Sequence, residues 1–259
     1  MISLCSENRL PPIIIILILV FIISLAMKPA LANQPPGKKP RDSVSVGTPM
    51  KGCLEQGEVL PKKGAGYVLT EEARKRKARF GASELVALIK QAAFKVNRKH
   101  RGGLLKVADL STRKGGRIDH HGSHQNGRDV DFVFYLTDTK GNPVLSHGFV
   151  PIDSNGFSTE PPMKYKFDTK RNWALVQALL TSDKAKVQWI FVSDKVKKLL
   201  LDYAREKKVS PRIIRMADQV LRQPGKKKAH VDHFHVRIYC PTSDKPKCKD
   251  VGPRWAWIK

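Results

Sequence analysis

Two short segments of the chain alternate polar and apolar residues with a period of two. They are DVDFVFY, residues 129–135, and HFHVRIY, residues 233–239. Because successive side chains of a β-strand point to opposite faces, this period predicts two strands. Asp129 and Asp131 then share one face of the first strand, and its valine and phenylalanine neighbours take the other. Each segment therefore requires a sheet that is apolar on one face and polar on the other.

The second strand repeats this arrangement with imidazoles in place of carboxylates. His233 and His235 point to one side, about 6.5–7 Å apart, while Phe234 and Val236 face the core. That separation suits one metal ligand and one neighbour that reaches a water on the metal.

The histidines of the chain are concentrated around these two strands. Six of the eight lie in HHGSHQNGRDVDF, residues 120–132, and HVDHFHVRIYC, residues 230–240. A single histidine is most often a surface or core residue satisfied by hydrogen bonds, but this clustering favours a functional site. His124 lies seven residues before Asp131, and Gly127 between them permits a turn. A loop histidine and a strand aspartate can therefore converge on one point.

Two histidines and one carboxylate from separate segments, with the fourth position open, match a catalytic rather than a structural zinc site. Zn²⁺ lowers the pKa of a bound water to about 7 and polarises a carbonyl oxygen, and a nearby histidine can accept or return the proton. A nucleophilic Ser-His-Asp or Cys-His site is the alternative chemistry. The chain has no G-x-S-x-G elbow, so the metal site is favoured.

Helical patterns separate the strands. Apolar residues recur at helical spacing over residues 83–99, and VQWIFVS, residues 187–193, is a buried strand followed by a helix over residues 194–208. Asp168 is the expected N-cap of a helix that contains NWALVQALL.

One further helix completes the predicted fold. Ser210 and Pro211 are typical of a helix start, and Gly225 of its end. Strands and helices mix without regular βαβ alternation, which predicts the α+β class. We expect one folded domain over residues 51–259.

The N-terminal region has the pattern of an export signal. A hydrophobic run over residues 13–27 precedes the small-x-small triplet Ala30-Leu31-Ala32, which predicts a signal peptide over residues 1–32. The alternative is an uncleaved membrane anchor; in both cases the rest of the chain is exported to the periplasm or cell envelope. Residues 33–50 are rich in proline and lysine and are expected to form a flexible linker.

The chain is strongly basic, with 48 Lys+Arg against 23 Asp+Glu and a net charge of +25. Such a charge attracts polyanions, namely nucleic acid, acidic lipid or cell-wall polymer. For an exported protein the envelope polymers are favoured, and neither nucleic acid nor, once the signal is cleaved, a stable membrane partner is expected. The oligomeric state is left open.

Three cysteines follow the predicted signal peptide. In an oxidising compartment, CPTSDKPKC predicts a local disulfide between Cys240 and Cys248. Cys53 is left without a partner, and we expect it to be free or linked between chains. Metal binding by these thiols is disfavoured because no C-x-x-C spacing is present.

The segments HGSHQNGRDVD and HVDHFHVRIYC together resemble the penicillin-insensitive murein endopeptidases. These enzymes are a branch of the LAS metallopeptidases, which also include lysostaphin-type enzymes and D-Ala-D-Ala carboxypeptidases. The resemblance runs from about Gly52 to the C-terminus. Gly122 and Asp129 replace the serine and alanine of the broader LAS motif, which is similar to the endopeptidase branch and weakens the carboxypeptidase interpretation.

The resemblance implies a zinc ion as the cofactor. By motif position, His124, Asp131 and His235 are the implied zinc ligands, and His121 lines the site or approaches the metal. The fold it implies is a single LAS-type α+β domain with flanking helices and an antiparallel sheet that carries the zinc site.

The resemblance also implies an activity. His233 is the implied catalytic histidine, supported by His230. The implied reaction is hydrolysis of peptidoglycan cross-links at the D-alanyl–meso-diaminopimelyl bond by zinc-activated water. Two alternatives are a D,D-carboxypeptidase of the same superfamily and an inactive, zinc-containing peptidoglycan-binding module. The retention of His233 with His230 counts against the inactive module.

Overall fold

The structure is a computed structural model that describes residues 43–160, 164–225 and 230–258. The predicted signal peptide, residues 1–32, lies outside the described residues. The predicted linker, residues 33–50, is wrong at its C-terminal end, because β1 (Val44–Thr48) pairs antiparallel with β2 (Lys51–Glu55). Backbone hydrogen bonds between the two strands compensate for a composition that suggests a mobile segment.

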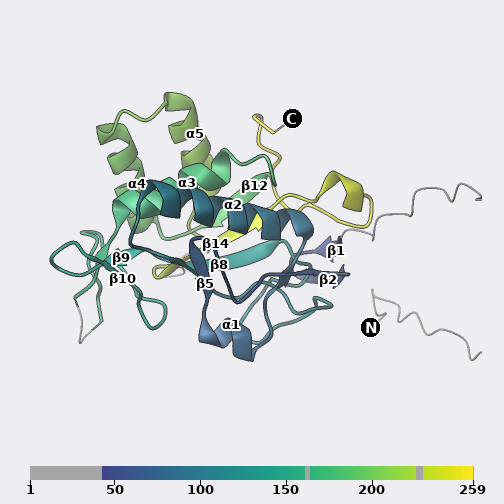
Figure 1. Cartoon of the computed structure of the whole chain (residues 1–259). Coiled ribbons are helices and arrows are strands. Elements are labelled where there is room, and N and C mark those ends of the chain that lie inside the picture. The colour runs from purple at the N-terminus through teal and green to yellow at the C-terminus, as the bar shows by residue number, and fades with distance from the viewer. Residues whose placement is uncertain (1–42, 161–163, 226–229, 259) are drawn as a thin grey trace, which may run out of the picture. The chain divides into compact units, whose positions relative to one another are not determined.

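A seven-stranded mixed sheet forms the centre of the fold (Figure 1). The three pairings from β12 through β14 and β8 to β7 are antiparallel, and the β13–β12 and β5–β7 pairings are parallel. The predicted strands at 129–135, 187–193 and 233–239 are confirmed, each with a shortened end. The sheet order is β13 (Leu221–Arg222), β12 (Val187–Phe191), β14 (His233–Ile238), β8 (Asp129–Val133), β7 (Leu105–Val107), β5 (Tyr67–Leu69) and β4 (Lys63–Gly64).

Figure 1 shows two of the long helices, α2 and α3, lying over β8 and β14. Helix α3 packs against α2 on one side and against α4 and α5 on the other, and α5 also contacts β12. Apolar residues of these helices and of the strands beneath them form one continuous core. The helices are α2 (Ser83–Lys99), α3 (Thr169–Leu180), α4 (Asp194–Glu206) and α5 (Pro211–Val220).

Local sequence signals explain where most helices begin. The side chains of Asp168 and Ser193 accept hydrogen bonds from the first turns of α3 and α4, and Pro211 occupies the first turn of α5. The expected end of α5 at Gly225 is wrong. The helix ends at Val220 because the following residues pair with β12 as β13.

Short elements surround the central sheet. Strands β9 (Leu136–Thr137), β10 (Pro143–Val144) and β11 (Lys166–Phe167) form a small sheet, and β3 (Glu58–Val59) pairs with β6 (Phe80–Gly81). Helix α1 (Glu71–Lys75) lies between β5 and β6 in the chain, and the 3₁₀ turn η1 (Thr242–Asp244) follows β14. The α+β class is thus confirmed.

The disulfide between Cys240 and Cys248 is confirmed. Cys53 is also disulfide-bonded, and no described cysteine is free. The expectation that Cys53 is free is therefore wrong. Among the described residues, no helix combines the length and the apolar character needed to cross a bilayer.

Candidate metal centre

The pairing of β14 with β8 brings the two histidine-rich segments together. The strands are antiparallel, and their register sets His235 opposite Asp131 and Arg237 opposite Asp129. Residues directly opposite on neighbouring strands have Cβ atoms about 4.5–5.5 Å apart. These four side chains therefore share one face of the sheet, opposite the buried residues Val130, Phe132, Phe234 and Val236 that belong to the apolar core.

His124 reaches this face from the loop before β8. Its backbone has a positive φ of 66°, and its N–H donates to Asp129 Oδ2 at 3.0 Å. Its carbonyl accepts from the Ser111 hydroxyl. Such backbone strain persists only where surrounding contacts hold it, and it is common at functional sites.

The tautomer of His124 follows from its neighbours. Nδ1 lies 2.9 Å from the carbonyl oxygen of Leu110, which can only accept, so Nδ1 carries the proton. Nε2 then carries no proton, so its lone pair can bind a metal. It lies 3.4 Å from Asp131 Oδ1. The imidazole is fully buried. A carbonyl partner of this kind is what orients metal-binding histidines in known sites.

Three atoms that could bind a metal form a nearly equilateral triangle. His124 Nε2 is 3.3 Å from His235 Nδ1, and Asp131 Oδ1 is 3.4 Å from the first and 3.3 Å from the second. Tetrahedral zinc with ligand bonds of about 2.0–2.1 Å has ligand atoms about 3.3–3.4 Å apart. Asp131 Oδ1 is also buried without a hydrogen-bond partner among the described residues. The donor set and its spacing therefore fit a metal ion of this size.

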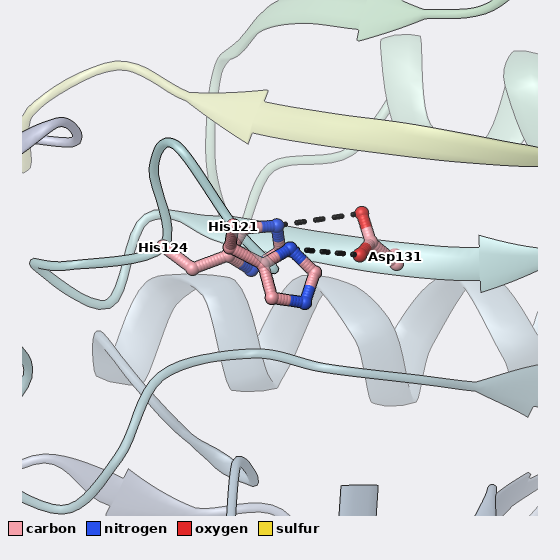
Figure 2. A group of neighbouring side chains, drawn as sticks. All are labelled: His121, His124 and Asp131. Carbon is pink, nitrogen blue, oxygen red and sulfur yellow. Dashed lines mark ion pairs between the residues drawn. The ribbon is translucent and has the colours of Figure 1, made fainter. Parts of the chain in front are cut away.

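His121 is a further ligand candidate (Figure 2). His121, His124 and Asp131 offer ligand atoms that all lie within 4.8 Å of one another, and Figure 2 shows both rings beside the carboxylate. His121 Nε2 lies 2.9 Å from Asp109 Oδ2, which leaves Nδ1 directed at Asp131 Oδ2, 3.8 Å away. The triangle that includes His235 is tighter, so we favour His235 as the third ligand.

Two histidines flank the triangle without belonging to it. His233 Nδ1 lies 2.6 Å from Asp232 Oδ1, and its Nε2 faces Asp131 Oδ1 at 3.7 Å. The ring of His230 lies 4.8 Å from that of His233 and 5.5 Å from that of His235. Burial, reinforced by the two neighbouring imidazoles, lowers the pKa of His230 to about 3, so this ring is neutral at neutral pH.

The carboxylates at the centre stay ionised. Burial opposes the charged form of Asp129, but Arg237, with Nε at 2.7 Å and Nη2 at 3.1 Å, helps to hold its pKa well below the usual value. Burial likewise opposes the ionised form of Asp131, whose pKa is held well below its usual value by His124 and His235. Burial also disfavours the charged form of His235, yet Asp129 and Asp131 raise its pKa to about 9. The two ionised aspartates thus give the site a negative potential that favours a bound cation, and in the absence of a metal they favour the protonated form of His235.

All six histidine and aspartate residues expected from the sequence come together here. Five of them, all except the buried His124, line one open pocket of about 640 Å³. The lining also includes side chains that belong to neither histidine-rich motif: Met50, Arg76, Asp109, Phe149 and Phe191. These come from β12 and from loops or helix ends far from the motifs, and only a three-dimensional arrangement reveals them. Asp232 is different, because its place beside His233 in the sequence was a usable signal.

A buried His-His-Asp triangle on one face of an α+β sheet has the donor set of the metal centres found in metal-dependent hydrolases. The chain belongs to the penicillin-insensitive murein endopeptidase family, whose model matches residues 45–255. It is accordingly a peptidase of the metal-dependent class.

Named relatives agree with this assignment. A penicillin-insensitive murein endopeptidase of Klebsiella pneumoniae strain 342 is 28% identical over 217 residues, which cover 81% of this chain and 70% of the relative. The enzyme of that name from Pectobacterium atrosepticum is 29% identical over 210 residues, covering 80% and 68%. The one from Salmonella arizonae is 26% identical over 215 residues, covering 82% and 71%.

Proposed function

We propose that this protein is an exported zinc metalloendopeptidase that hydrolyses the peptide cross-links of peptidoglycan at the D-alanyl–meso-diaminopimelyl bond. The observation that carries the proposal is the triangle of His124, Asp131 and His235 beside His233, in a chain of the murein endopeptidase family. The names of the relatives support peptidoglycan as the substrate.

In this proposal His124, Asp131 and His235 hold the zinc, and His121 approaches it. When bound, zinc acidifies a water molecule and polarises the scissile carbonyl oxygen. The chain's own contribution is to fix the ligands: the Leu110 carbonyl orients His124, and Asp129 lies 3.5 Å from the outer nitrogen of His235.

His233 is the proposed proton carrier. Because Asp232 accepts the Nδ1 proton at 2.6 Å, the Nε2 lone pair faces the triangle and is available to take a proton. The same nitrogen can then return that proton to the leaving amine. His230 is neutral and packs against His233, so its role is to support the site.

The proposed location is the periplasm or another part of the cell envelope. The support is the hydrophobic run over residues 13–27 and the Cys240–Cys248 disulfide, which is typical of oxidising compartments. The net charge of +25 suits an anionic polymer as partner.

Digestion of purified murein with and without a chelator tests the function. We expect cross-linked dimers to be converted to monomers that keep their terminal D-alanine, as read by mass spectrometry, and we expect the chelator to stop the reaction. Release of free D-alanine alone would establish a carboxypeptidase instead. Binding of murein without any product would establish an inactive binding module.

A further inference from the structure

The pocket beside the metal centre contains two permanently charged cations among its described lining residues, Arg76 and Arg237. Arg237 is buried, and its Nε and Nη2 both donate to Asp129. Its guanidinium is therefore already occupied by the hydrogen bonds that position Asp129. Arg76 differs, because its side chain is 40% exposed and its contact with Asp109 uses Nη1.

Arg76 follows α1 and is its C-cap residue. The sequence around it, EEARKRKAR, has the character of an exposed basic helix face. Its neighbours fit that description: Arg74 and Lys75 are exposed and pair with Glu71 on the same helix. Arg76 alone of this basic run lines the pocket.

A short series of contacts fixes Arg76 relative to the metal centre. Arg76 Nη1 lies 2.6 Å from Asp109 Oδ2, and the same oxygen lies 2.9 Å from His121 Nε2. His121 in turn faces Asp131. Asp109 is almost fully buried. Nη1 thus holds the guanidinium beside the metal centre, and the side chain, 40% exposed, lines the pocket that a ligand would enter.

We propose that Arg76 binds a carboxylate of the substrate and so determines which cross-link is cleaved. The inference rests on the proposed function. In a D-alanyl–meso-diaminopimelyl cross-link, the scissile nitrogen is attached to a carbon that also carries a free carboxylate. That carboxylate must lie close to the metal centre whenever the scissile carbonyl does.

The chemistry of the guanidinium suits this task. It carries five N–H donors in a planar fork that matches a carboxylate, and hydrogen bonds between charged partners are roughly twice as strong as neutral ones. Asp109 occupies one edge and sets the orientation, so the fork is preorganised before substrate arrives. A lysine at this position would keep the positive charge but lack the planar pair of N–H donors that matches a carboxylate.

The test compares two purified muropeptide dimers, one with the free carboxylate beside the scissile nitrogen and one with that group amidated. For the free acid, Arg76→Gln is expected to lower kcat/KM about 10- to 100-fold, mainly through a higher KM. For the amidated dimer the same variant is expected to change kcat/KM less than about threefold. Arg76→Lys should recover part of the loss.

Two controls separate recognition from damage to the site. Arg74→Gln removes a neighbouring exposed cation that does not line the pocket, and it should leave both dimers unaffected. Zinc content per chain should equal that of the wild type in Arg76→Gln. Calorimetric binding of the monomeric product, which keeps the carboxylate, should weaken in Arg76→Gln without any turnover being measured.

Equal losses on both dimers, or unchanged product binding in Arg76→Gln, would overturn the role of Arg76 while leaving the proposed function intact. A wild-type enzyme that cleaves neither dimer would contradict the proposed function itself, and the inference would fall with it.

Discussion

The two faces of the central sheet are built from the same strands but are held together by different forces. On β8 and β14, Val130, Phe132, Phe234 and Val236 point toward the helices and are fully buried. The intervening residues of the same strands point the other way and carry the charges of the metal centre. We call these the helix face and the metal face.

The difference separates stability from chemistry. The helix face is stabilised by burial of apolar area, about 25 cal/mol per Å², which does not depend on a metal. The metal face buries ionised aspartates and imidazoles, which is costly unless they are paired or bind a cation. Substitutions on the helix face should therefore lower stability, and those on the metal face should lower metal binding and turnover.

The largest expected effect is at the triangle. Replacing His124, Asp131 or His235 by alanine should abolish murein cleavage and sharply weaken zinc retention, because each substitution removes a ligand. Elemental analysis of the purified variants, with circular dichroism as the folding control, checks this. Full zinc occupancy in His124→Ala would contradict the assignment of His124 as a ligand, and with it the proposal that the metal face holds the zinc.

The next effect concerns proton transfer on the metal face. His233→Ala should keep zinc and fold but lower turnover about 10²–10⁴-fold, and His230→Ala should cost about 10–100-fold if it only orients the site. Steady-state kinetics on cross-linked muropeptides, normalised to zinc content, give the order of severity. A zinc-replete His233→Ala enzyme with near wild-type turnover would contradict the role of His233.

The matched control on the helix face is Phe234, which lies between His233 and His235 and points away from them. Phe234→Ala should lower the free energy of unfolding by about 3–5 kcal/mol. Zinc per folded molecule and turnover should stay near wild type. Urea unfolding and zinc analysis on the same sample measure both quantities, and loss of zinc from the folded variant would show that the faces are coupled.

The smallest expected effect lies beyond both faces. The Cys240–Cys248 disulfide closes a loop after β14. Because the loop is short, removing it by a double alanine substitution should cost about 2–3 kcal/mol of unfolding free energy. Activity at moderate temperature should persist. Complete loss of structure would mean that the loop supports β14 more directly than its position suggests.

Much of this division can be predicted from the amino-acid sequence. The period of two in β8 and β14 sets which residues share a face, and a strand allows no other arrangement. The same period therefore predicts that the histidines of β14 share one face, as do the aspartates of β8. Helix α2 follows from its apolar spacing, and α3 from the cap at Asp168.

The rest depends on contacts between segments distant in sequence. Asp109 reaches the pocket because its segment forms backbone hydrogen bonds with Asp131 of β8, and Arg76 reaches it through its contact with Asp109. No local pattern in the sequence marks such proximity. The helix end predicted from Gly225 is wrong because the residues after Val220 pair with β12 as β13, and this pairing outweighs the glycine signal. Strand β1 has no such signal, because its partner, not its composition, makes it a strand.

We infer that the metal binds between His124, Asp131 and His235. A crystal of the zinc-loaded enzyme, measured at the zinc absorption edge, would locate the ion. We predict one strong anomalous peak about 2.0–2.2 Å from His124 Nε2, Asp131 Oδ1 and His235 Nδ1. A peak bound by His121 in place of His235, or no peak at this position, would contradict the account.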